Sequence, residues 1–399
     1  MTKAPQDVPA HIPRSHADDY TAEAAAERRA FVQERTDARL EHVGRYSFDP
    51  AGLPGNIENF LGAAQVPIGL AGPLRVNGEH AEGDFYIPMA TTEGTLVASY
   101  NRGMRLITEC GGAKATVVAR SMQRSPVFIF DDALEARAFG DWVDAHFEAI
   151  KAAAEATTRS GRLTSIQQFA VGPTRHLRFN YATGDAAGQN MSGKATFAAC
   201  EWIRANRPGG ARYILSGNTD TDKKHSQMNM LMTRGRRVVA EAVLGRDALK
   251  RVMRVDSRDL FHARQLSQTG AFLAGSANNG AHAANGLAAM FIATGQDVAN
   301  VAESHAAIVY AQLLDGGDYY WSITLPALIV ATVGGGTGLA TQSECLAVLG
   351  CRGSGKADKL AEICAAVALA GDISLSCAIL AGDWVTSHER YGRNRPPPM

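Results

Sequence analysis

The chain has 399 residues, which is longer than one typical hydrophobic core and therefore predicts two or three domains. Its 40 Lys and Arg residues balance 40 Asp and Glu residues, so the formal net charge at pH 7 is zero. Because no basic run carries interleaved aromatic residues either, we exclude a nucleic-acid partner.

The cysteines and the apolar segments indicate the compartment. The six cysteines lack paired CxxC spacing and stand mostly in apolar, helix-like surroundings, which predicts buried, reduced thiols. The N-terminus has no apolar core of the signal-peptide type, and no window approaches the ~18 uninterrupted apolar residues of a membrane span. We therefore expect a soluble, cytoplasmic protein that has no membrane partner and no metal site.

In the first hundred residues the sequence predicts a polar N-terminal segment, a helix and a loop-rich segment. Residues 1–20 are polar and proline-rich, and a charged, alanine-rich helix follows in residues 21–40. Residues 56–74 (NIENFLGAAQVPIGLAGPL) carry Gly and Pro at short intervals, which excludes one long helix. A short strand is predicted at 84–87, and an apolar helical segment follows the turn that carries Glu93.

Residues 126–216 show a self-contained alternation of strands and helices. Strand-like SPVFIF precedes a helix at about 132–157, whose apolar residues recur at three- and four-residue spacing. Strand-like LTSIQQFAV and HLRFNY, helix-like QNMSGKATFAACEWIRANR and strand-like ARYILS follow. This β-α-β-β-α-β order is the ferredoxin-like arrangement.

From Arg237 onward we predict long alanine- and glycine-rich helices, interrupted by a strand within 318–339 that ends in the glycine loop TVGGGTGL. This loop does not fit the dinucleotide fingerprint G-x-G-x-x-G, so we do not expect a Rossmann fold. The last helices, in 356–371 and 372–392, present a continuous apolar face. The tail after Tyr391 is too basic and proline-rich to be core.

Charged or titratable groups stand among small or apolar residues in four segments, 88–105, 215–224, 291–300 and 386–395. Simple structural roles remain open for these groups. Thr91 and Thr92 supply N-cap chemistry, so Glu93 could serve only the dipole of the following helix. Lys223 could be a solvated turn residue, and Asp297 could be a helix cap.

Taken together, these segments resemble 3-hydroxy-3-methylglutaryl-coenzyme A reductase, in its soluble, class I-like catalytic form. The resemblance runs from about residue 56 to 395 and includes NIENFLG, VPIGLAGPL, PMATTEG, NRGMR, GDAAGQNM, SGNTDTDKK, GQD, TVGGGTGL and SHERYGRNR. It implies NADPH-dependent conversion of 3-hydroxy-3-methylglutaryl-coenzyme A to mevalonate through mevaldehyde. Two hydrides are consumed.

The resemblance also implies an α+β fold. A helix-rich large substrate and dimerisation domain (46–125 and 217–399) would follow an N-terminal helical lead (1–45). A ferredoxin-like small domain (126–216), inserted in the large one, would hold the cofactor. A homodimer is the smallest plausible unit, because the apolar segment 56–74 offers more surface than one chain can cover.

The family's site residues match positions of this sequence. The implied catalytic residues are Glu93, Lys223, Asp297 and His388, with Asp297 bridging Lys223 and Glu93, and with His388 protonating the departing thiolate. Arg124 would hold the free carboxylate of the substrate, and the other implied substrate or coenzyme A contacts are Ser216, Asn218, Asp222, Lys224, Ser99, Asn101 and Arg102. Thr158 and Arg159 would meet the 2′-phosphate of NADP, and the remaining cofactor contacts would be Gly184, Asp185, Gly188, Asn190, Met191, Gly335 and Gly336.

Three features depart from the family pattern. Ala187 and Gln189 stand where two methionines are usual, residues 278–286 (NNGAHAANG) look one residue short, and His305 replaces an Asn. Two other functions therefore stay open, a paralogous reductase for a different acyl-coenzyme A and a degenerate relative that only binds nucleotide or coenzyme A. Retention of the four catalytic positions argues against the second.

Overall fold

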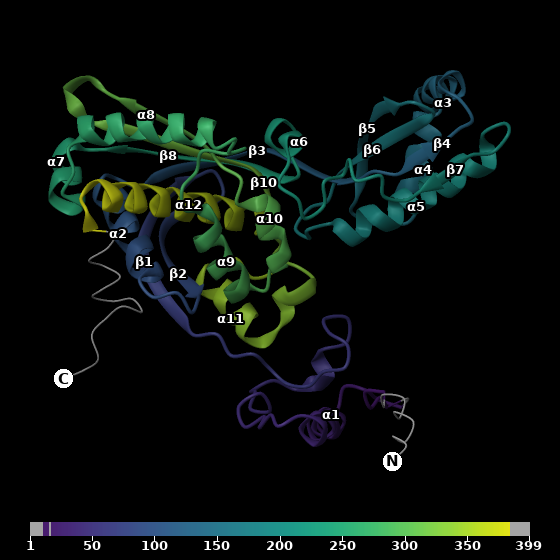
Figure 1. The fold of residues 1–399 in the computed structure, drawn as a ribbon, viewed down its shortest axis with the longest axis horizontal. Helices are drawn as coiled ribbons and strands as arrows, with labels where there is room; N and C mark the ends of the chain where they lie inside the picture. Colours follow the sequence, from purple (N-terminus) through teal and green to yellow (C-terminus); the bar gives the residue numbers. More distant parts are fainter. Residues whose placement is uncertain (1–10, 16, 384–399) are drawn as a thin grey trace, which may run out of the picture.

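The computed structural model of the chain describes residues 11–15 and 17–383 and contains both helices and strands (Figure 1). The strands are β1 (Ile68–Gly78), β2 (Glu82–Ala90), β3 (Ala113–Arg124), β4 (Val127–Ile129), β5 (Arg162–Val171), β6 (Thr174–Ala182), β7 (Arg212–Ile214), β8 (Gly235–Leu244), β9 (Ile308–Leu313) and β10 (Tyr319–Leu328). The α-helices are α1 (Ala22–Arg35), α2 (Leu96–Glu109), α3 (Ala133–Ala145), α4 (Phe147–Glu155), α5 (Gln189–Asn206), α6 (Gln227–Leu231), α7 (Arg246–Ala248), α8 (Ser257–Leu273), α9 (Ala283–Thr294), α10 (Val301–Ser304), α11 (Ala340–Val348) and α12 (Ala357–Leu380). Short 3-10 or π turns connect them: η1 (Pro50–Gly52), η2 (Leu249–Met253), η3 (Val298–Asn300), η4 (Asp315–Gly317) and η5 (Gly335–Gly338).

Strand β3 belongs to two parts of the molecule. Its stretch from Lys114 to Ser121 pairs with β8, and the three residues from Met122 to Arg124 pair with β6. The strands therefore form one continuous path, β7-β4-β6-β3-β8-β10-β9, with β1 beside β3, β2 beside β1 and β5 beside β6. Figure 1 shows β3 running from the large body toward the smaller one that carries α3–α5.

Helix α12 forms the centre of the larger core. Figure 1 shows it lying across the body, close to α2, α9 and β8, and most of its side chains are buried. At its crossing with α2 the helices approach so closely that a Cβ on Gly103 would lie 1.9 Å from the carbonyl oxygen of Ala370. The helix is long and apolar enough to cross a membrane, but 78% of its most apolar window is buried inside the protein, which is typical of a core helix.

A second core lies between the strands of the smaller body and α3, α4 and α5. Phe128, Phe139, Phe179 and Tyr181 belong to it and are buried. The strand order β7-β4-β6-β5 is antiparallel throughout. The predicted strands and the predicted helix after residue 188 are confirmed here.

The single helix predicted at 132–157 is wrong. Asp132 caps α3 as a helix start, but the chain turns at His146 and begins α4 at the next residue. The His146 ring stacks on Trp142 with centroids 4.2 Å apart, and its Nδ1 lies 2.7 Å from the Trp142 carbonyl oxygen. These local contacts accompany φ and ψ values of −110° and 16°, which leave the helical region.

The prediction of helices beginning at Arg237 is also wrong, because residues 235–244 form β8 between β3 and β10. Burial alternates along this strand, as expected for a strand that packs one face on the core. Within the described residues the two predicted C-terminal helices are one helix, α12, and residues 384–392 of the second prediction lie outside them. Asp372 does not end it, since its buried carboxylate accepts hydrogen bonds from the N–H groups of Ala281 and His282.

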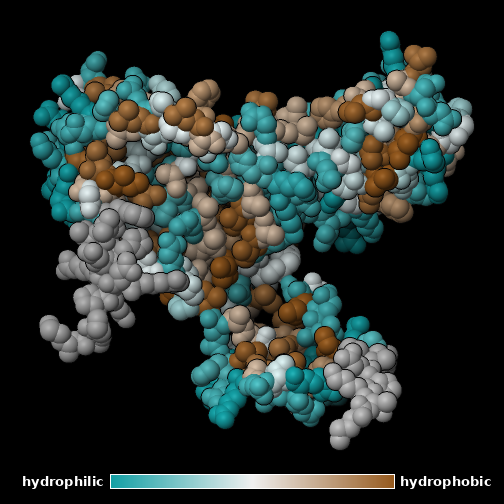
Figure 2. Space-filling view, viewed as in Figure 1, coloured by the Kyte–Doolittle hydropathy of each residue, from teal (hydrophilic) through white to brown (hydrophobic). Residues whose placement is uncertain are grey.

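The N-terminal segment makes a small cluster of its own. Helix α1 packs through Ala25 against Leu53 and Phe60, and Leu339, just before α11, packs against this cluster. Hydrophobic side chains gather where this segment faces the rest of the protein (Figure 2), and a cavity of about 570 Å³ lies there. Residues 56–67 contain no helix, as predicted.

Candidate active site

Lys223 and Asp297, which the sequence predicts as partners, form an ion pair. Lys223 lies in the loop between β7 and α6, and its Nζ is 2.9 Å from Asp297 Oδ2. Asp297 follows the end of α9 and also caps η3 by accepting the N–H of Ala299. The hydrogen bond to Asp297 raises the pKa of Lys223, and both side chains remain nearly half exposed, at 45% and 43%. A ligand can therefore reach a lysine that stays cationic.

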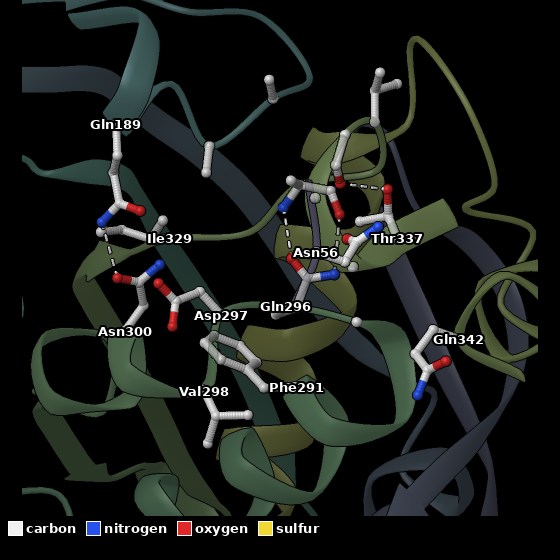
Figure 3. A pocket seen from close by; sticks show the side chains of 18 of the residues that line it. Asn56, Gln189, Phe291, Gln296, Asp297, Val298, Asn300, Ile329, Thr337 and Gln342 are labelled. Atoms are coloured by element: carbon white, nitrogen blue, oxygen red, sulfur yellow. Dashed lines mark hydrogen bonds between the residues drawn. The ribbon is translucent and has the colours of Figure 1, made fainter. Parts of the chain in front are cut away.

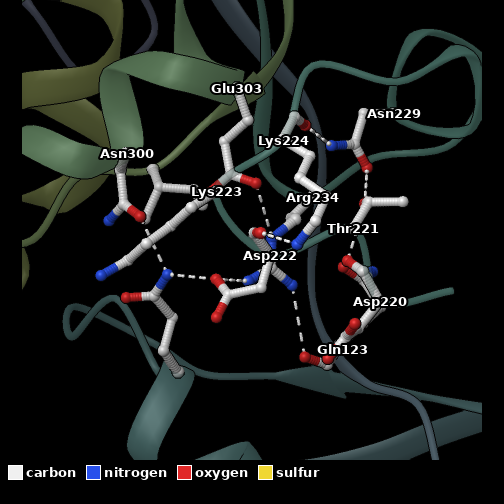
Figure 4. A network of polar contacts seen from close by, with 12 residues as sticks. Gln123, Asp220, Thr221, Asp222, Lys223, Lys224, Asn229, Arg234, Asn300 and Glu303 are labelled. Atoms are coloured by element: carbon white, nitrogen blue, oxygen red, sulfur yellow. Dashed lines mark hydrogen bonds and ion pairs between the residues drawn. The ribbon is translucent and has the colours of Figure 1, made fainter. Parts of the chain in front are cut away.

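A buried arginine holds the loop that carries this lysine (Figure 4). The Arg234 side chain has no exposed surface and donates to Asp222 Oδ1 at 2.6 Å and to Glu303 Oε2 at 2.9 Å. Burial raises the pKa of Glu303 to about 7, although Arg234 opposes that shift. Sequence reasoning missed Arg234 and Glu303. An acid in the alanine-rich run ANVAESHAA was the available signal for Glu303.

Other predicted substrate residues lie around the same loop. Arg124 Nη1 pairs with Asp220 Oδ2 at 3.0 Å, and the Ser216 hydroxyl donates to the same oxygen at 3.4 Å. Lys224 Nζ donates to the carbonyl oxygen of Asp222 at 3.0 Å. Asn218 has a φ of +65°, so the loop turns sharply there. The structure thus brings the five predicted substrate contacts Arg124, Ser216, Asn218, Asp222 and Lys224 to one loop and its flank.

Glu93 occupies the turn between β2 and α2. Its N–H donates to Thr91 Oγ1 at 3.0 Å, and its carboxylate accepts from Asn285 Nδ2 at 3.1 Å. Helix α2 begins at Leu96 after Thr95, which has a φ of +76° and makes no side-chain cap. The N-cap role predicted for Thr91 and Thr92 is therefore wrong, because the helix starts later and the Thr91 hydroxyl turns toward Glu93.

The predicted bridge from Asp297 to Glu93 does not appear among the described residues. Asp297 contacts Lys223, whereas Glu93 contacts Asn285, so the three residues divide between two pairs. Lys223 lies on the loop after β7, and Glu93 lies on the loop after β2.

The start of α9 is fixed so that Asn285 meets Glu93. The buried Asp372 accepts the N–H groups of Ala281 and His282, and burial raises its pKa to about 6. The Tyr100 hydroxyl donates to the His282 carbonyl oxygen at 2.5 Å and accepts the N–H of Gly286 at 2.8 Å. These contacts anchor both sides of Asn285.

Asp297 of the ion pair lines a cavity of about 680 Å³ (Figure 3). Its walls come from residues 186–191 at the start of α5, 295–298 after α9 and 333–337 around η5. Asp297 is the one ionisable side chain among the described lining residues. Five predicted cofactor residues contribute to the walls, namely Gly188, Asn190, Met191, Gly335 and Gly336. The N–H groups in the first turn of α5 have no helical partners and can bind an anion.

The other predicted cofactor residues lie outside this wall. The Asp185 carboxylate accepts the N–H groups of Gly355 and Ala357 at the start of α12, and the Gly184 carbonyl accepts from Arg236. Thr158 Oγ1 accepts the N–H of Gly161. Arg159 is exposed beyond the end of α4.

The residues predicted to meet coenzyme A lie on α2 and contact neighbouring elements. The hydroxyl groups of Ser99 and Ser374 are 3.2 Å apart, and Arg102 Nη2 donates to the Ser374 carbonyl oxygen at 2.8 Å. Asn101 Oδ1 accepts the N–H of Gly72 at 2.8 Å. His388 lies outside the described residues, so its predicted role stays a prediction.

Comparison with known proteins gives a family and a fold. The family model described as hydroxymethylglutaryl-coenzyme A reductase matches residues 24–393. The 3-hydroxy-3-methylglutaryl-coenzyme A reductase of Aeropyrum pernix is 45% identical over 93% of this chain and 90% of that protein. The enzyme of Methanocaldococcus jannaschii is 42% identical over 92% of both chains. The class II enzyme of Streptococcus pneumoniae bound to NADPH has a similar fold, with a TM-score of 0.66 and 20% identity over 91% of this chain and 99% of that one.

We expect Arg234→Met to cost about 3–5 kcal/mol of unfolding free energy at pH 8, because it leaves the buried Glu303 carboxylate without its cation. Glu303 holds its proton to a higher pH in the folded chain than its usual 4.5, so its contribution to stability falls as the pH rises from about 4.5 to 7. Loss of Arg234 raises that folded pKa further, and the variant should lose less at pH 5 than at pH 8. Urea unfolding at both pH values measures this, and an equal loss would contradict the assigned role of Glu303.

Proposed function

The chain belongs to the hydroxymethylglutaryl-coenzyme A reductase family, and we propose that it reduces 3-hydroxy-3-methylglutaryl-coenzyme A with NADPH. One thioester, two NADPH and two protons would give mevalonate, coenzyme A and two NADP⁺, through mevaldehyde. The observation that carries this proposal is the accessible ion pair of Lys223 and Asp297 beside the 680 Å³ cavity. A lysine held in its charged form suits a reaction in which negative charge develops on an oxygen.

Lys223 is the proposed electrophilic group. Negative charge gathers on the carbonyl oxygen as a thioester or an aldehyde is reduced, and a fixed cation stabilises it. Asp297 raises the pKa of Lys223, so the lysine remains charged at neutral pH. The buried Arg234 fixes the neighbouring Asp222, which limits how far the lysine backbone can move.

Glu93 is the proposed proton donor to the substrate oxygen in the aldehyde step. Its contact with Asn285 orients the carboxyl group, and α9 holds Asn285 through the anchored residues around it. The family match also implies that Asp297 bridges Lys223 and Glu93, and this network remains a proposal for the protein with its substrate bound. His388 is proposed to protonate the thiolate of coenzyme A as the thiohemiacetal collapses.

The cavity fits a dinucleotide in size and in chemistry. Its volume lies within the range of small-molecule sites, and the first turn of α5 offers unpaired N–H groups to a pyrophosphate. When bound, the reduced nicotinamide supplies hydride in both steps. The relative from Streptococcus pneumoniae was solved with NADPH, which supports the same cofactor here.

We assign the smaller body, residues 126–216, as the cofactor domain and classify it as ferredoxin-like. Its strand order β7-β4-β6-β5 supports this, since it matches an antiparallel βαββαβ sheet rather than a parallel Rossmann sheet. Residues 46–125 and 217–399 would form the large substrate domain, after the lead at 1–45. Thr158 and Arg159 are proposed to contact the 2′-phosphate, with Gly184 and Asp185 supporting the loop before α5.

The substrate and its coenzyme A part are proposed to lie between the Lys223 loop and α2. Arg124 would bind the free carboxylate of the substrate, and its pairing with Asp220 leaves other guanidinium N–H groups to do so. The remaining substrate contacts would come from Ser216, Asn218, Asp222 and Lys224. Ser99, Asn101 and Arg102 would meet coenzyme A.

A homodimer or higher assembly, acting in the cytoplasm, completes the proposal. The exposed side chains of Ile68 and Leu70, within residues 56–74, and of Tyr86 on the neighbouring β2 support an apolar contact surface there. A reductase for a different acyl-coenzyme A is the second candidate. Gln189 favours it, because its amide lies at the cavity wall where the family usually has methionine.

We expect Lys223→Ala to lower NADPH oxidation with 3-hydroxy-3-methylglutaryl-coenzyme A, and also with mevaldehyde, by about 10²- to 10³-fold. The same cation serves the oxygen in both steps. Absorbance of NADPH measures both rates, with the exposed Lys250→Ala as the matched control. Activity within a few-fold of the parent would remove Lys223 from the mechanism, and a parent that accepts only other acyl-coenzyme A thioesters would favour the second candidate.

The role of His388 is tested by separating the two half-reactions. His388→Gln should slow thioester reduction by about 10²- to 10⁴-fold and retain most reduction of added mevaldehyde, because no thiolate leaves in that step. Glu93→Gln should impair the aldehyde step at least as severely. Equal losses of both activities in His388→Gln would refute the proton-donor role.

Arg159→Ala should raise the KM for NADPH by about tenfold and leave NADH use almost unchanged, since only NADPH has the 2′-phosphate that the guanidinium would bind. The exposed Arg137→Ala, on α3 of the same body, is the control. If the variant loses both cofactors equally, Arg159 is structural.

A further inference from the structure

Gln189 joins the two segments that carry the ion pair. It is the first residue of α5, and its side-chain Nε2 donates to Asp222 Oδ1 at 3.0 Å and to Asn300 Oδ1 at 2.9 Å. Asp222 directly precedes Lys223, and Asn300 closes η3, which Asp297 caps. One amide group therefore connects three elements of the site, and Figure 3 shows its bond to Asn300.

The geometry uses both hydrogens of the amide. Each points to an oxygen that cannot donate to it, a carboxylate on one side and an amide oxygen on the other. The reversed amide would place its oxygen against both acceptors, so the side chain has one favourable orientation. Asn300 is almost fully buried, and Asp222 Oδ1 is also bound by the buried Arg234, so both acceptors are themselves fixed.

We propose that Gln189 is a positioning residue. It fixes the distance between the Lys223–Asp297 ion pair and the start of α5, which forms one wall of the cavity. This proposal rests on the proposed function. A methionine or a shorter amide at this position could line the cavity, but neither could bridge Asp222 and Asn300. Gln189 lines the cavity as well, so a binding role must be distinguished from a positioning role.

The kinetic test compares Gln189→Met and Gln189→Asn with the parent. Both variants should lower kcat by about tenfold to hundredfold, because a hydrogen bond to a charged acceptor is lost, and should leave the KM for NADPH within about threefold. Gln33→Met, at an exposed position of α1, makes the same exchange away from the site and should change neither constant. A raised KM with an unchanged kcat, or full activity of Gln189→Asn, would overturn the positioning role.

A double-mutant cycle tests the path through Asn300. If Gln189 acts through this acceptor, Gln189→Met should lower kcat clearly less in an Asn300→Ala background than in the parent. Additive losses in kcat would show that the two residues act separately and would overturn the bridge.

A measurement without substrate separates this proposal from the proposed function. In Gln189→Met, backbone amides in 217–224 and 297–301 should exchange with deuterium faster than in the parent and in Gln33→Met, while those of α12 should keep their protection. Unchanged exchange in both segments would refute the link. Failure of the parent to oxidise NADPH would refute the proposed function and leave the exchange result decisive for Gln189.

Discussion

The candidate site depends on a cation that no solvent reaches. Arg234 is completely buried, and a buried guanidinium persists only where anions and hydrogen-bond acceptors surround it. Asp222, Glu303 and the carbonyl oxygen of Gln123 supply these, each from a different segment. The same contacts that satisfy Arg234 therefore bring together the loop after β7, the end of β3 and the short helix α10. Removal of the arginine would leave two carboxylates facing each other.

The two ion pairs of this region, Arg234–Glu303 and Lys223–Asp297, differ in exposure, and they therefore have different roles. The Arg234–Glu303 pair is dry, so its geometry is rigid and its energy depends on matched charges. The Lys223–Asp297 pair is half exposed, so its energy is small and its cation can turn toward an incoming oxygen. The buried pair holds the surrounding segments in place, and the accessible pair is open to a ligand.

Much of the secondary structure and many of the site residues could be predicted from the sequence. The side-chain partners of those residues could be predicted less well. The helix after Gly188 and the strands around 162–182 follow local periodicity, which needs no distant partner. Strand β8 was missed because its alanine- and valine-rich run also suits a helix, and only pairing with β3 and β10 decides between them. The sequence indicated Lys223, Asp297 and Glu93, yet the partner of Glu93 is Asn285, which lies 192 residues further along the chain.

Backbone conformation explains why the position of Lys223 could not be predicted locally. Six non-glycine residues of the described chain have positive φ, and three of them, Asn218, Thr221 and Lys223, lie within one short loop. Such conformations cost about 1–3 kcal/mol each, so the sequence of the loop would not choose them by itself. Contacts from outside the loop must impose them: Arg234 binds Asp222, Asn229 accepts from the Thr221 hydroxyl, and Asp297 pairs with the Lys223 ammonium. The geometry of the lysine therefore depends on the packed core around the loop, and changes that loosen these partners should relax the loop before they disturb the sheets.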